Sequence, residues 1–104
     1  MTKTSRPLDD TVVELLREDP SFADEYLAAA LDEADQPGGQ AALLAALRHV
    51  AEAQGMAAVA ERAGIPRESL YRALSPTGNP TIKTLLAVFS AAGLKLTVHH
   101  TVAA

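Results

Sequence analysis

The sequence has no cysteine and no long apolar run, and each absence removes a class of protein. Without cysteine, neither a disulfide framework nor a thiolate metal site can form in this 104-residue chain. No apolar segment reaches the ~18 residues that span a bilayer, and none follows the first basic residues as in a secretory signal. We therefore expect a cytoplasmic protein that has no membrane partner.

The polar residues form no pattern typical of catalysis or of metal binding. The histidines are His49 and the adjacent pair His99 and His100, whose side chains would point to opposite faces of a strand. The many carboxylates of the first 35 residues have no histidine or serine partner at a catalytic spacing. Gly38-Gly39 lacks the lysine and hydroxyl of a phosphate-binding loop. We therefore expect no enzymatic activity, no metal and no cofactor.

Aromatic residues make up only 4% of the chain, and alanine and leucine dominate its apolar 48%, which favours closely packed helices. Apolar residues recur at spacings of three and four over 9–18, 20–34 and 40–54, which predicts three amphipathic helices. Asp9 or Asp10 would cap the first helix. The residues expected to face inward are Val12, Leu15 and Leu16, then Phe22, Tyr26, Leu27, Ala30 and Leu31, then Leu43, Leu44, Leu47, Val50 and Ala51.

Residues 56–74 have the pattern of a helix-turn-helix, in which two short helices are joined by a tight turn. Gly64 ends the first helix because glycine adopts the left-handed conformation without strain, and Pro66 presets the first turn of the second. In DNA-binding proteins this second helix enters the major groove. Here it would bury Leu70, Ala73 and Leu74 and expose Arg67, Glu68, Tyr71 and Arg72.

If this motif binds DNA, its residues divide between bases and phosphates. Arg67 can bond bidentately to guanine, and Glu68 can accept a hydrogen bond from cytosine. Glu68 could instead pair with Arg72 four residues on and only stabilise the helix. Backbone N–H groups at the start of the first helix would face a phosphate. The predicted DNA-binding residues are Met56, Ala57, Arg67, Glu68, Ser69, Tyr71, Arg72, Asn79 and Lys83, each of which could also be a solvated surface residue.

The net charge of −4 conceals a division of charge along the chain. Residues 1–35 hold ten acids and three bases, whereas residues 36–104 hold three acids and six bases. The basic part suits phosphates and the acidic part suits a basic partner, although an acidic helical face can also be simply solvated. A Gln-Pro-Gly-Gly break coincides with the change. This predicts an acidic helical extension over 1–36 and a helix-turn-helix DNA-binding domain with a terminal strand over 37–104.

The last part of the chain predicts one more helix and a strand. Thr81 would cap a helix that Gly93 ends, with Ile82, Leu85, Leu86 and Phe89 facing inward. Residues 94–99 alternate apolar and polar, which is typical of a strand. A lone strand leaves its backbone unpaired, so Leu94, Leu96 and Val98 would pair with a second copy in a two-fold dimer or add to a partner's sheet. An irregular tail is the alternative.

The predicted fold is mainly α: a phage-repressor-like bundle of five to six helices containing the helix-turn-helix, with one short C-terminal β-strand. Within residues 20–99, the segments that carry a family resemblance are Tyr26-Leu27, 29–31, 46–53, 60–74, Gly78-Asn79-Pro80 and 92–96. Over these segments the chain resembles the HigA-like antitoxins, the helix-turn-helix antidote proteins of addiction modules. The most specific parts are 67–74 and Gly78-Asn79-Pro80.

The resemblance implies a type II antitoxin that binds operator DNA, represses its own operon and neutralises a RelE/ParE-like toxin by protein–protein contact. The acidic front of the chain or its terminal strand would contact that toxin. Two other functions remain open from the sequence: a stand-alone phage-type transcriptional repressor without a toxin, and a protein-binding module whose helix-turn-helix no longer binds DNA.

Overall fold

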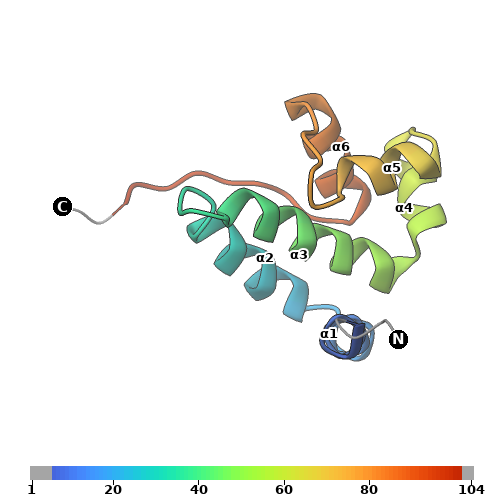
Figure 1. Cartoon of the computed structure of the whole chain (residues 1–104), viewed down its shortest axis with the longest axis horizontal. Helices are drawn as coiled ribbons and strands as arrows, with labels where there is room; N and C mark the ends of the chain where they lie inside the picture. The colour runs from blue at the N-terminus through green and yellow to red at the C-terminus, as the bar shows by residue number, and fades with distance from the viewer. Residues whose placement is uncertain (1–5, 102–104) are drawn as a thin grey trace.

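The computed structural model describes residues 6–101 (Figure 1). Within that range it contains six helices and no strand. Loops of various lengths join them, and residues 94–101 follow the last helix without regular secondary structure. The helices are α1 (Arg6–Glu18), α2 (Phe22–Asp32), α3 (Gly39–Gln54), α4 (Met56–Ala63), α5 (Arg67–Ala73) and α6 (Ile82–Ala91). None of these helices is both long enough and apolar enough to cross a bilayer.

Helix α3 is the element against which the rest of the chain is arranged. Helices α1 and α2 pack on one side of it, and α4 follows its end and packs in turn against α5 and α6 (Figure 1). The predicted inner stripe of α3 is confirmed, because Leu44, Leu47 and Val50 are buried. Residues before and after the predicted division at 36/37 belong to one hydrophobic core, which includes Leu16 and Leu70.

Helix α1 begins at Arg6, three residues earlier than the predicted start at residue 9. Asp9 and Asp10 are therefore inside the helix and do not cap it. Val13 is buried, whereas Leu15, which we expected to face inward, is 47% exposed. Residues two apart lie roughly 200° apart around a helix, so a face that buries Val13 leaves Leu15 in solvent.

Helix α6 begins with the predicted cap, since the Thr81 side chain accepts a hydrogen bond from the backbone N–H of Thr84 at 3.1 Å. Phe89 is buried as expected, but Ile82 and Leu86 are 73% and 51% exposed. The prediction that these two residues face inward is wrong. The apolar face of α6 is wider than the surface that α4 covers, so its Ile82–Leu86 edge remains in solvent.

The predicted C-terminal strand is absent. A strand requires a neighbour with which its backbone groups form hydrogen bonds, and residues 6–101 contain no other strand. The backbone N–H of Leu94 instead donates to the carbonyl of Phe89 at 2.9 Å, next to the end of α6. The segment then runs back across the molecule beside α2 (Figure 1). Pairing of Leu94, Leu96 and Val98 with a second copy stays a prediction.

The last carbonyl groups of a helix have no hydrogen-bond partner inside the helix. Here two arginines and a glutamine donate hydrogen bonds to such carbonyl groups. Arg62 Nε donates to the carbonyl of Ala91 at 2.8 Å, and Gln54 Nε2 donates to the carbonyl of Ala92 at 2.9 Å. Arg48 Nη1 donates to the carbonyl of Leu74 at the end of α5. Two of the six bases in the basic part of the chain are thus bound to the backbone, which the charge count alone did not reveal.

Candidate nucleic-acid interface and its acidic neighbour

The turn between α4 and α5 has the geometry that its sequence predicted. Gly64 adopts the left-handed conformation at φ 75°, and the N–H of Ile65 bonds to the carbonyl of Ala60 at 3.1 Å, which closes α4. Pro66 is extended and precedes the first residue of α5. Leu70 and Leu74 are fully buried and hold this helix against the core. The exposed residues of α5 are the four expected ones: Arg67, Glu68, Tyr71 and Arg72.

Arg67 and Tyr71 lie beside the beginning of α4. They line a hollow of about 720 Å³ together with Met56 and Ala57, the two residues whose backbone N–H groups were expected to face a phosphate. The Met56 side chain is buried, while Ala57 is exposed. The structure therefore brings four of the predicted DNA-binding residues to one place, although they come from two helices.

A second hollow, of about 390 Å³, lies at the other end of α5 and includes Ser69, Arg72 and Asn79. Arg72 Nη2 donates to Ser69 Oγ at 3.4 Å, and no ion pair joins Glu68 to Arg72 in the described part of the chain. Glu68 and Lys83 are exposed but line neither hollow. The DNA-binding role of all these residues stays a prediction.

Gly78 fixes the loop that carries Asn79. Its N–H donates to the carbonyl of Ser75 at 2.9 Å, and a Cβ at this position would overlap the carbonyl of Ala73. Only glycine permits so close an approach of two backbone segments. The loop over 75–80 is thereby held against the end of α5, which places Asn79 next to Arg72.

Helix α1 brings acidic residues to the edge of the arginine-bearing face of α5. Asp10 and Glu14 line the same hollow as Arg67 and Tyr71, and Glu14 forms an exposed ion pair with Arg17 at 3.2 Å. From the sequence we expected the acidic front of the chain either to suit a basic partner or to be simply solvated. Part of that front lies beside α5, where a negative charge would oppose the approach of phosphates.

A partly buried hydrogen-bond network, which we did not predict from the sequence, joins α1, α2 and α3. Tyr26 Oη lies 2.7 Å from His49 Nδ1, and His49 Nε2 lies 3.1 Å from Asp9 Oδ1. A carboxylate only accepts, so Nε2 donates to Asp9, and in that tautomer Nδ1 accepts from the tyrosine hydroxyl. Burial, and next the charge of Asp9, raise the pKa of Tyr26. The one signal in the sequence is a histidine beside the apolar stripe of α3.

The fold and its exposed faces describe a small, mainly helical protein in which an acidic helix adjoins an arginine-bearing one. Residues 6–100 match the family described as "Probable addiction module antidote protein". The match covers nearly the whole chain, so the chain belongs to this family, which implies a toxin partner in general terms.

Among curated proteins, the chain is similar to a protein of Haemophilus influenzae. This uncharacterized protein is 40% identical over 78 residues, which are 75% of this chain and 80% of the relative. No solved structure matches the chain.

Replacing Tyr26 by phenylalanine should lower the free energy of unfolding by about 1–3 kcal/mol, because it leaves Nδ1 of the buried His49 without a donor. Urea denaturation near neutral pH measures the change. Tyr71→Phe is the matched control, since Tyr71 is 46% exposed and its replacement should change stability by less than about 0.5 kcal/mol. Equal unfolding midpoints for Tyr26→Phe and the wild-type chain would contradict the network.

The same pair of proteins tests the raised pKa of Tyr26. The folded state holds the phenolic proton more tightly than the unfolded state, so the stability from this group is complete below the ordinary tyrosine pKa of about 10 and is lost as the pH rises above it. The stability difference between wild type and Tyr26→Phe should therefore shrink above about pH 10. A difference that stays constant across that range would show that Tyr26 titrates normally.

Proposed function

We propose that the chain is the antitoxin of a type II toxin–antitoxin module, a cytoplasmic and non-enzymatic protein. It binds operator DNA, represses its own operon and neutralises a RelE/ParE-like toxin by direct contact. Membership of the antidote family carries the proposal. The exposed arginines of α5, on a helix whose opposite side is buried, support the DNA-binding part of it.

In this proposal α4 and α5 act as a helix-turn-helix, with α5 in the major groove. Arg67 contacts a guanine edge, and the adjacent pair of Ser69 and Arg72 contacts bases or the backbone one turn on. Backbone N–H groups at Met56 and Ala57 face a phosphate, a role that the N-terminus of a helix suits. Asn79 and Lys83 contact phosphates, Glu68 and Tyr71 contact base edges or methyl groups, and the site needs neither metal nor cofactor.

The alternatives are less well supported. A stand-alone repressor has no need of a toxin, whereas the antidote family is defined by one. A module that binds only protein has no need of arginines free of carboxylate partners. Arg67 forms no ion pair or hydrogen bond with the described residues, and Arg72 is bonded only weakly to Ser69.

A homodimer is part of the proposal, because a palindromic operator is matched by a two-fold protein. The exposed edge of α6 supports it: Ile82 and Leu86 lie one turn apart and together present an apolar surface to solvent. This edge is a second candidate for the dimer contact, beside the predicted pairing of Leu94, Leu96 and Val98 with a second copy.

The DNA-binding face is tested with the DNA upstream of the chain's own gene. Arg67→Ala should weaken binding about 10- to 100-fold, since a bidentate arginine–guanine contact is worth about 1–3 kcal/mol. A gel-shift titration measures the loss. Lys95→Ala removes one positive charge at a residue that lines neither hollow of α5 and should change binding less than about threefold. Equal losses for the two variants would show that Arg67 contributes only charge.

The acidic residues of α1 beside α5 lead to a second prediction, in which a substitution raises the affinity for DNA instead of lowering it. Neutralising Asp10 and Glu14 together, as Asp10→Asn and Glu14→Gln, should tighten DNA binding about two- to tenfold at low salt, because two charges that repel phosphates are lost. The gain should disappear as salt is raised. Asp32→Asn with Glu33→Gln makes the same change in net charge at the end of α2 and is the control. A loss of affinity in the α1 variant would instead place these carboxylates in contact with bases.

The antitoxin role is tested with the product of the neighbouring gene. We expect a short reading frame beside this gene to encode a basic protein that stops growth when expressed alone. Co-expression with this chain should restore growth, and the two proteins should co-purify. If the neighbouring product has no effect on growth and does not bind the chain, the antitoxin proposal fails and the repressor alternative stands.

A further inference from the structure

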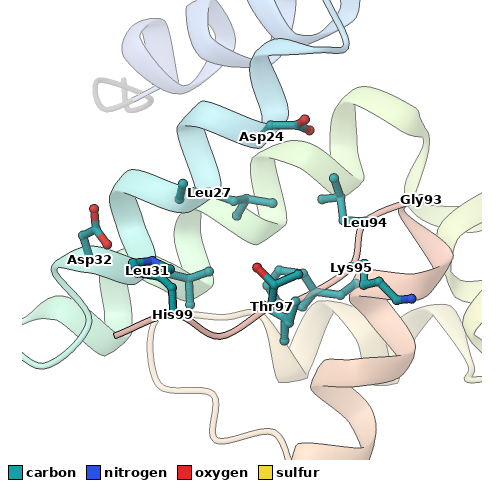
Figure 2. Close-up of a pocket in the computed structure, with 12 residues that line it drawn as sticks. Asp24, Leu27, Leu31, Asp32, Gly93, Leu94, Lys95, Thr97 and His99 are labelled. Atoms are coloured by element: carbon teal, nitrogen blue, oxygen red, sulfur yellow. The ribbon is translucent and has the colours of Figure 1, made fainter. Parts of the chain in front are cut away.

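A groove of about 430 Å³ lies between α2 and the segment that follows α6 (Figure 2). Leu27 and Leu31 of α2 form one wall, and residues 93–97 with His99 form the other, with Phe89 of α6 also contributing. The two regions that the sequence named as alternative toxin contacts, the acidic front and the chain end, therefore meet in one place. None of the groove's residues lines either hollow at α5.

The groove combines an apolar lining with acidic ends. Leu27 is buried as expected, whereas Leu31, which we wrongly expected to face inward, is 39% exposed. Leu96 is 40% exposed, so a leucine on each wall remains open to solvent. Asp24 and Asp32 lie eight residues apart on α2, which is about 12 Å along the helix axis. They stand toward opposite ends of the α2 wall (Figure 2).

The charged residues in and around α2, which forms the first wall of the groove, are all acidic. Residues 18–47 contain seven acids and no lysine or arginine. On the opposite wall, Lys95 is the basic residue, and its ammonium group points away from α2 (Figure 2). His99 lies near Leu31 at one end of the groove (Figure 2). An occupant of the groove therefore meets apolar side chains between two carboxylates.

We propose that this groove is the toxin-binding surface and that it takes a basic, amphipathic segment of the toxin. The inference rests on the antitoxin function proposed above. Apolar side chains of that segment cover Leu31 and Leu96, and its lysines or arginines pair with Asp24 and Asp32.

Charge complementarity selects this occupant over two others. A nucleic acid would bring phosphates to the acidic wall, which repels them. A second copy of the chain in a two-fold contact would place the acidic wall against its own equivalent, because such a contact joins the same patch on both copies. A basic protein segment is the occupant that both the carboxylates and the leucines favour.

The test uses the purified product of the neighbouring gene as the probe and isothermal titration calorimetry as the measurement. The double variant Asp24→Lys with Asp32→Lys should bind that protein at least about tenfold more weakly than the wild-type chain. Glu18→Lys with Glu61→Lys is the matched control, since it makes the same change in net charge at two exposed residues outside the groove. The control should bind within about threefold of wild type, because exposed charges away from an interface contribute little.

A second variant removes the apolar contribution without changing charge. Leu31→Gln with Leu96→Gln should also weaken toxin binding at least about tenfold, and both positions are exposed enough for the fold to persist. Circular dichroism verifies the fold of each variant. Operator binding by this second variant should equal that of the wild-type chain, because the two surfaces share no residue.

Each outcome decides a different point. If the wild-type chain binds the neighbouring product and both groove variants bind it equally well, the groove inference is overturned and the antitoxin function stands. If the wild-type chain does not bind that product, the antitoxin function fails and the inference fails with it. If light scattering shows that Leu31→Gln with Leu96→Gln turns a dimer of the chain alone into a monomer, the groove is a contact between copies and the inference is wrong.

Discussion

The packing of α1, α2 and α4 against α3 is the constraint on which the whole structure depends, because α5 and α6 pack in turn against α4. An isolated helix as short as α4 or α5 is marginal in water, so each of them must bury an apolar face to persist. Leu47 and Val50 of α3 belong to the same core as Leu70 of α5, which gives α5 a rigid support. Because α1 and α2 use the other side of α3, the acidic and the arginine-bearing faces of the molecule are set by one helix.

Hydrogen bonds from side chains to the carbonyl groups at helix ends also hold the helices in this arrangement. Arg62 and Gln54 bind the carbonyl groups at the end of α6, and Arg48 binds the end of α5. An arginine held in this way stabilises the fold and is drawn away from the surface at which phosphates would bind. The bases that remain exposed on α5 are Arg67 and Arg72. Net charge along a sequence is therefore a weaker guide to a binding face than the list of partners that each charged group already has.

The features predicted correctly are those set by neighbouring residues. Gly64 ends α4 and Thr81 caps α6, because the conformation or hydrogen bond that each supplies depends on a few adjacent residues. The predictions that failed depend on distant parts of the chain: the strand over 94–99 needed a neighbour that residues 6–101 do not supply, and the inward face of α6 depended on how much of it α4 covers. For the candidate site, the exposed face of α5 was predictable, whereas the position of α1 beside it was not.

The position of α1 connects the two faces of the molecule. Tyr26 on α2, His49 on α3 and Asp9 on α1 form a continuous set of hydrogen bonds, and Asp9 lines the hollow that also contains Arg67. An occupant on α2 would therefore touch one element of this partly buried network, and a DNA duplex on α5 would lie beside another, α1. Energetic coupling between two sites requires an element with two arrangements that both ligands bias. The structure shows α1 in one arrangement, which the hydrogen bond between Asp9 and His49 helps to hold, so coupling through α1 would require that hydrogen bond to break.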